Sequence, residues 1–156
     1  AAEVLEQLGI ESEVHTLSAH RTPEAVVEYV TKSEAAGYKA FICGAGGAAH
    51  LAGVVAAHTA LPVIGVPMMN AKMGAAGVDA LFSTVQMPPG IPVATVAING
   101  AKNAGLLALK ILALSDPAVN KKINALSATM NREVKGKAKT LEEKGFKKYL
   151  HEKEKG

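Results

Sequence analysis

The chain has 156 residues, of which 49% are hydrophobic and 4% aromatic, and its net charge is +3. This length predicts one domain with a buried core, and the shortage of aromatic side chains argues against a protein that stacks nucleic-acid bases. Residues 135–156 contain eight Lys and four Glu, which leaves a charge of −1 for the rest of the chain. The basic balance therefore belongs to the C-terminal segment, and we expect no nucleic-acid partner.

Cys43 is the only cysteine, which excludes an internal disulfide and disfavours a metal–thiolate cluster. A single cysteine suits a reducing compartment, so we expect a cytoplasmic protein. No set of His, Asp, Glu and Cys has metal-ligand spacing, and no apolar run is long enough to span a membrane. We therefore expect neither a bound metal nor a membrane partner.

Apolar runs alternate with segments of helical spacing along the chain. Strands are expected at 14–17, 39–43, 62–66 and 92–98, and helices at 3–8, 23–36, 48–58, 102–114 and 118–134. The range 71–86 is expected to form a helix or two, broken near Gly74 and Gly77. This alternation predicts βαβ units and a parallel sheet covered by helices on both faces. Ligands of such sheets bind beyond the carboxyl ends of the strands, where we expect four segments: 18–22, 44–50, 67–74 and 99–103.

The composition divides the chain into a domain at 1–134 and a tail at 135–156. The tail is rich in Lys and Glu with isolated apolar residues, and two interpretations stay open. It is either a solvated helix or an arm that packs on a neighbouring subunit.

The run Ser18-Ala19-His20-Arg21-Thr22-Pro23 lies where a strand is expected to turn into a helix. Thr22 suits the N-cap and Pro23 the first helical position. The N–H groups of a helix start favour an anion, and the guanidinium of Arg21 matches a phosphate. Since histidine exchanges protons readily near neutral pH, the run predicts an acid/base at His20 beside an anion site. A solvated helix cap is the alternative.

The run Gly44-Ala45-Gly46-Gly47-Ala48-Ala49-His50 follows an expected strand and opens a helix. Glycines at such a place let backbone N–H groups approach a ligand. The spacing partly matches the dinucleotide fingerprint, but no acidic residue ends the next strand at Val66-Pro67, so we expect no nicotinamide site. Tight packing of strand on helix is the alternative.

Several segments together carry a family resemblance. They are Ser18–Pro23, Gly44–Leu51, Pro62–Pro67, Gly77–Leu81, Val85–Val96 and Asn103–Ala108. Over roughly residues 1–134 the chain resembles the N5-carboxyaminoimidazole ribonucleotide mutases of purine biosynthesis, the catalytic subunits of the PurE family. Its Gly-Ala-Gly-Gly-Ala-Ala-His form resembles the mutase class rather than the class that carboxylates aminoimidazole ribonucleotide directly with carbon dioxide.

The resemblance implies a flavodoxin-like, three-layer αβα fold, a homo-octamer, and no metal, nucleotide or organic cofactor. It implies an isomerase that moves a carboxylate from the exocyclic nitrogen of the ribonucleotide to a carbon of its imidazole ring, through loss and recapture of carbon dioxide. The family begins with a strand and a Gly-Ser-x-Ser-Asp loop. We expect an upstream segment to supply them, because Ala1 already lies in a helix-like run.

By the same resemblance, His20 is the general acid/base and Arg21 holds the phosphate, while Ser18 and Ala19 line the base. The other matched residues surround the carboxylate or close the pocket; they are Gly44, Ala45, Gly46, Gly47, Ala48, His50, Leu51, Met87 and Pro88. The chemistry is consistent with this assignment, because a phosphate held away from the reacting atoms positions them, and a closed apolar pocket retains carbon dioxide.

Three alternatives stay open at this point. The first is a lyase-type carboxylase that uses free carbon dioxide. The second is a non-catalytic subunit that binds a phosphoribosyl ligand, and the third is an oligomerisation scaffold.

Overall fold

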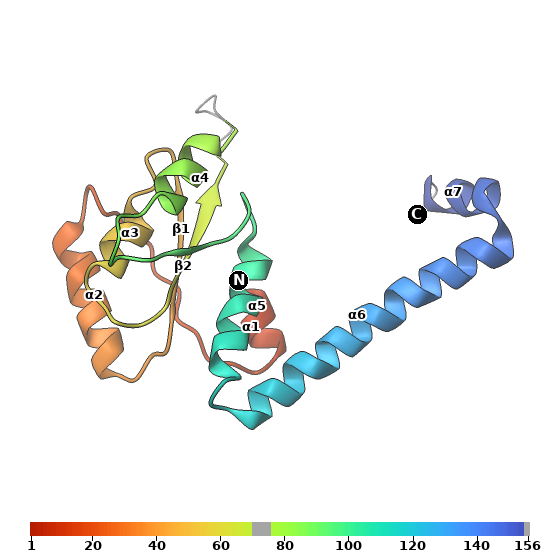
Figure 1. Cartoon of the computed structure of the whole chain (residues 1–156), viewed down its shortest axis with the longest axis horizontal. Coiled ribbons are helices and arrows are strands. Elements are labelled where there is room, and N and C mark those ends of the chain that lie inside the picture. Colours follow the sequence, from red (N-terminus) through yellow and green to blue (C-terminus); the bar gives the residue numbers. More distant parts are fainter. Residues whose placement is uncertain (70–75, 155–156) are drawn as a thin grey trace.

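The chain is described by a computed structural model that covers residues 1–69 and 76–154. Within these residues, a parallel sheet of order β1-β2-β3 consists of Phe41–Gly46, Val63–Met68 and Ala94–Thr95. The helices are α1 Ala2–Gln7, α2 Pro23–Ala35, α3 Leu51–Ala56, α4 Val78–Val85, α5 Ala101–Leu112, α6 Pro117–Lys144 and α7 Phe146–Glu154. Helices lie on both sides of the sheet (Figure 1), as the predicted three-layer fold requires.

Alternate side chains of the strands point to opposite faces, so each face has its own core. On one face Phe41 and Cys43 of β1 pack with Val26 and Val30 of α2 and with α3. On the other face Ile64 and Val66 of β2 pack against Ala104 and Ala108 of α5. A strand buried on both faces has to be apolar throughout, which β2 is.

A third cluster joins α1, α5 and α6 on the outer side of α5. Leu5, Leu109 and Val119 are buried there, with Ile123 packed against them. Lys122 adds a polar contact, since its Nζ donates a hydrogen bond of 2.6 Å to the Leu8 carbonyl at the end of α1. The first two turns of α6 therefore belong to the body.

Beyond these two turns, α6 extends away from the sheet and the helices that cover it. The short helix α7 follows it, and the two helices form an arm (Figure 1). Asp116 caps the start of α6, where its side chain accepts hydrogen bonds from Ala118 N at 2.8 Å and Val119 N at 3.2 Å. The predicted end at residue 134 is wrong, because α6 continues to Lys144. A helical Gly136 costs about 1 kcal/mol relative to alanine, and the Lys, Ala, Leu and Glu residues around it are good helix formers. No helix within the described residues has the length and apolar character needed to cross a membrane.

The strand predicted at 14–17 does not form. A strand needs a ladder of backbone hydrogen bonds, and residues 11–17 make none to another described segment. Side chains hold this segment instead: the ring of His15 lies 4.3 Å from that of Tyr29 between centroids. Glu13 contacts Tyr38, and this hydrogen bond raises the pKa of Tyr38 to about 12.

Two further boundaries differ from the prediction. The loop expected to start at Gly44 starts later, because Gly44–Gly46 still pair with Val66–Met68 in the parallel ladder. The strand expected at 92–98 shrinks to two residues, because only Ala94 and Thr95 pair with β2. Of the helical range expected at 71–86, residues 78–85 form α4. Residues 71–75 lie outside the described part of the chain.

Candidate functional site

The loop before α2 is built around Ser18. The Oγ1 atom of Thr22 accepts a hydrogen bond from Ser18 N at 2.9 Å and donates one to Ser18 O at 3.1 Å. The Ser18 Oγ accepts from Arg21 N at 3.2 Å and from Arg21 Nε at 3.4 Å. These contacts close the loop on itself and present His20 and Arg21 on its exposed side.

Thr22 occupies the predicted N-cap position of α2, but its side chain makes no capping hydrogen bond. Its hydroxyl makes both of its hydrogen bonds to the backbone of Ser18, within the loop rather than with the helix start. Pro23 lacks an N–H, and the next N–H groups of the first turn stay available. The helix start therefore keeps the anion-binding character that its sequence predicts.

His20 and His50 meet across 30 residues of sequence. His20 Nε2 lies 2.7 Å from His50 Nδ1, and the rings are perpendicular with centroids 4.8 Å apart. In such a contact one nitrogen donates and the other accepts.

His50 reaches this position through the turn between β1 and α3. Gly47 and Ala49 in this turn have positive φ angles of 64° and 42°. The left-handed conformation is costly for alanine, and Ala49 is buried, so the surrounding packing holds it there. The turn brings the start of α3 toward the loop of residues 18–22.

The carboxyl end of β1 forms a bare backbone edge next to β2. A Cβ atom added at Gly46 would lie 2.9 Å from the carbonyl oxygen of Met68, and one at Gly44 would lie 3.0 Å from its sulfur. No larger residue fits at Gly46 without moving backbone. The glycines thus allow close approach of the neighbouring strand β2, rather than the strand-on-helix packing considered as the alternative, and Gly44 and Gly46 remain exposed.

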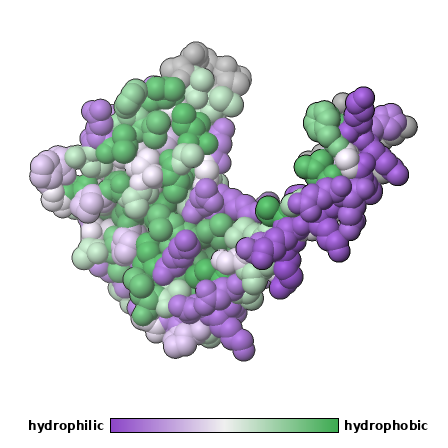
Figure 2. Space-filling view, turned by 45° about the vertical axis from the view of Figure 1, so that its right-hand side comes forward, coloured by the Kyte–Doolittle hydropathy of each residue, from purple (hydrophilic) through white to green (hydrophobic). Residues whose placement is uncertain are grey.

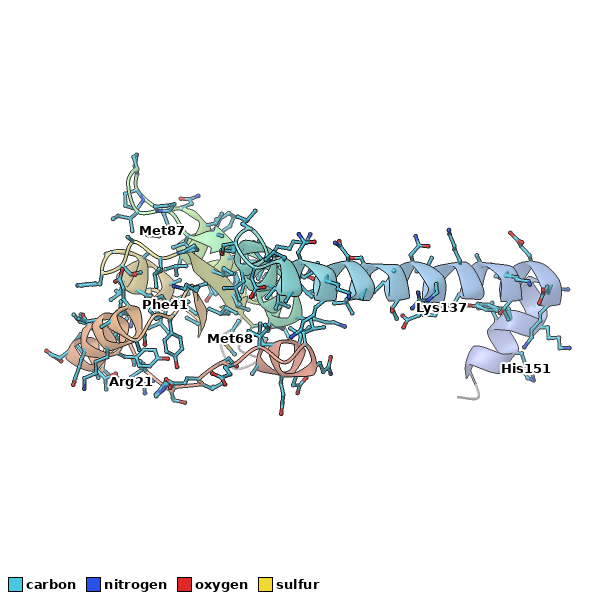
Figure 3. All side chains as sticks on the ribbon, turned by 90° about the horizontal axis from the view of Figure 1, so that it is seen from below. Arg21, Phe41, Met68, Met87, Lys137 and His151 are labelled. Atoms are coloured by element: carbon cyan, nitrogen blue, oxygen red, sulfur yellow. The ribbon has the colours of Figure 1, made fainter. Side chains whose placement is uncertain are left out.

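The structure gathers some of the predicted site residues more tightly than others. Leu51 begins α3 and packs against the core cluster of β1 and α2. Met87 follows α4 and packs against α3, with its methyl 3.1 Å from where a Cβ of Gly53 would be. Figure 3 shows Met87 and Arg21 well apart. Ala19 and Ala45 are half-buried, whereas Ala48 and Pro88 are exposed. One chain therefore brings together the loop of His20 and the turn of His50, but not Met87 with Arg21.

Cys43 lies in β1 just before the glycine edge. It is buried, and burial raises the pKa of its thiol to about 12. It packs as a small core residue rather than as a nucleophile. In the described part of the chain, no three His, Cys, Asp or Glu side chains are grouped so that they could hold a metal ion.

A model of the family described as AIR carboxylase matches residues 1–133. The chain belongs to the AIR carboxylase family. Relatives include the N5-carboxyaminoimidazole ribonucleotide mutase of Thermotoga maritima, 53% identical over 99% of this chain and 89% of that protein. The mutase of Pyrococcus horikoshii is 52% identical over 97% of this chain and 85% of its own length. The predicted family is confirmed, and these relatives carry the name of the predicted reaction.

Two further relatives of this AIR carboxylase family member inform the fold and the choice of reaction. The crystal structure of Treponema denticola PurE has a TM-score of 0.81 at 30% identity, over 90% of this chain and 86% of that one. This confirms the predicted fold. The phosphoribosylaminoimidazole carboxylase of Candida albicans is 51% identical over 97% of this chain, which spans 26% of that longer protein.

Proposed function

We propose that this chain is an N5-carboxyaminoimidazole ribonucleotide mutase of purine biosynthesis. The observation that carries the proposal is the paired His20 and His50, 2.7 Å apart. Arg21 follows His20 directly, and His50 lies in the turn that follows the glycine edge of β1. The names of the Thermotoga and Pyrococcus relatives support it. The arrangement offers a proton donor, an anion anchor and an uncluttered backbone surface, which are the three groups that the reaction needs.

In this proposal His20 serves both proton transfers. The bond between the exocyclic nitrogen and the carboxylate carbon breaks, carbon dioxide is released, and the nitrogen takes a proton from His20. The ring carbon then forms a bond to carbon dioxide and loses its own proton to His20. The histidine returns to its starting state, so the reaction consumes no acid, base or cofactor.

His50 orients His20 through the hydrogen bond between the two rings. Its contact through Nδ1 fixes the direction of the His20 ring, as the partner of a general acid/base commonly does. Ser18 and Ala19 lie in the loop that carries His20, and Gly44–Ala48 supply the surface for the carboxylate and carbon dioxide. Leu51 supplies an apolar wall, and Met87 and Pro88 of a neighbouring subunit would close the pocket.

Assembly into a homo-octamer completes the proposal. His20, Arg21 and His50 are all exposed in one chain, whereas retention of carbon dioxide requires a closed pocket. Figure 2 shows a mostly hydrophilic α6 with apolar side chains near its far end, where Phe146 is 68% exposed. A neighbouring subunit would cover both the exposed histidine pair and the apolar far end of α6. In this assembly residues 1–134 would be the catalytic domain and 135–156 a contact arm. Light scattering in solution measures the assembly.

The reaction is tested by turnover of N5-carboxyaminoimidazole ribonucleotide without ATP, metal or added bicarbonate. We expect conversion to proceed to equilibrium, because a mutase recaptures the carbon dioxide that it releases. Identity to the Candida carboxylase favours a second candidate, direct carboxylation of aminoimidazole ribonucleotide. A strict requirement for bicarbonate would establish that reaction and reject the mutase.

We propose the cytoplasm as compartment, which the single cysteine supports.

Arg21→Ala should raise the Michaelis constant about tenfold or more and change kcat less. A charge-assisted contact to phosphate contributes about 1.5–3 kcal/mol, and the phosphate lies away from the reacting atoms. The backbone hydrogen bond from Arg21 N to Ser18 Oγ remains, so the loop should keep its shape. Arg132→Ala is the control, because this exposed arginine of α6 contacts Thr129 instead. An unchanged Michaelis constant in Arg21→Ala would remove the phosphate role.

A further inference from the structure

Asn99 stands at the carboxyl edge of the sheet in a conformation that few residues adopt. It lies between β3 and α5 with a φ angle of 57°. This left-handed conformation is unfavourable for residues with a side chain, although asparagine tolerates it better than most. Its backbone N–H and C=O are both used, the first toward Pro67 O at 2.8 Å and the second by Ala101 N at 2.9 Å.

The Asn99 side chain makes a second link to β2. Its Oδ1 accepts a hydrogen bond of 3.0 Å from Met69 N. Asn99 therefore contacts the peptide groups on both sides of Met68, the Pro67 carbonyl before it and the Met69 N–H after it. The regular pairing of β2 with β3 ends near Gly65, where Val96 N donates to Gly65 O at 3.0 Å. Asn99 continues the connection beyond the ladder.

Met68 is the residue that lies against the glycine edge. It pairs with Gly46 across the parallel ladder. Its carbonyl oxygen would be 2.9 Å from a Cβ at Gly46, and its sulfur 3.0 Å from one at Gly44. Met68 is also 47% exposed, so part of it is accessible from solvent at this edge. A small shift of Met68 would change the shape of this edge.

We propose that Asn99 is a positioning residue that holds Met68 against Gly44 and Gly46 and so shapes the surface on which carbon dioxide is retained and recaptured. This inference rests on the proposed mutase function. It concerns the reacting end of the substrate and not the phosphate end, which Arg21 holds. Loss of the Asn99 side chain should therefore act on kcat more than on the Michaelis constant.

Three variants separate the side chain from the backbone conformation. Asn99→Gly keeps the left-handed backbone at no cost but removes the Oδ1 acceptor. Asn99→Asp keeps an acceptor oxygen and a tolerated backbone, and Asn99→Ala loses both. Ala76→Gly is the matched control, because Ala76 is also exposed and left-handed, with a φ angle of 50°, but has no polar side chain.

We expect Asn99→Gly to lower kcat about tenfold, the equivalent of one lost hydrogen bond, with unfolding temperature and Michaelis constant nearly unchanged. Asn99→Asp should keep kcat near the wild-type value. Any effect of its added charge should weaken with salt, whereas the effect of a lost hydrogen bond should not. Ala76→Gly should leave kcat unchanged. Wild-type kcat in Asn99→Gly, or an equal loss of kcat in Asn99→Asp, would overturn the proposal.

Amide hydrogen exchange at Met69 tests the contact without any substrate. In the full chain, Asn99→Gly should speed this exchange and Asn99→Asp should not. Unchanged exchange in Asn99→Gly would refute the contact itself. If the wild-type protein converts no substrate, the mutase proposal fails, while the exchange rates still decide whether Asn99 holds this part of β2.

Discussion

Replacing His20 by Asn should lower turnover by about a thousandfold, within the range of general acid–base catalysis. Both proton transfers of the proposed reaction pass through this imidazole, and an amide cannot take its place because it does not titrate near neutral pH. Binding should change little, since the phosphate contact belongs to Arg21. Turnover and the dissociation constant of the substrate, measured on the same preparation, separate the two effects.

His58→Asn is the matched control for this substitution. His58 is exposed like His20 and lies just beyond the end of α3. Its Nδ1 contacts Val54 O at 2.8 Å, so it is not part of the histidine pair. The control should retain full turnover. Near-normal turnover in His20→Asn would remove the acid/base role, whereas loss of binding together with turnover would make His20 a binding residue instead.

Local sequence signals predicted the elements that depend on local physics. Helix α2 begins at Pro23 as expected, and α5 falls where its apolar spacing placed it. The strand predicted at 14–17 does not form, because the alternation from Glu13 to Leu17 shows only that this segment could be a strand. Strand formation depends on a partner ladder elsewhere, which no local pattern contains.

The candidate site shows the same division. The sequence placed the loop of His20 and the turn of His50 at one edge of a sheet, since both follow expected strands. It could not predict the contact between the two rings, because this depends on the left-handed Ala49 and on how α3 packs. The roles inferred for Met68 and Asn99 were also missed. Their segments were expected at the edge, and the Asn-Gly pair at 99–100 was the available signal for a left-handed residue.

Gly65→Ala should destabilise the fold by about 3 kcal/mol, the upper end of the usual cost of overpacking a core. Gly65 lies in the middle of β2, and a Cβ there would come within 3.0 Å of Val93 Cγ1 and far closer still to Thr84 Cγ2. The gain in backbone entropy from alanine, about 0.5–1 kcal/mol, is too small to offset this. Thermal unfolding should show a midpoint lower by roughly 6–12 °C.

The double variant Gly65→Ala with Thr84→Ser tests the cause of this loss. Serine removes the Cγ2 methyl of Thr84 and keeps the hydroxyl that donates to Ala80 O at 2.6 Å. Thr84→Ser alone should destabilise slightly, because it leaves a small cavity, yet in the double variant it should recover part of the lost midpoint. Gly136→Ala is the control: nothing lies within 4 Å of its Cβ position in α6, so alanine should stabilise the helix. Strict additivity in the double variant would mean that contact with Thr84 is not what glycine at position 65 avoids.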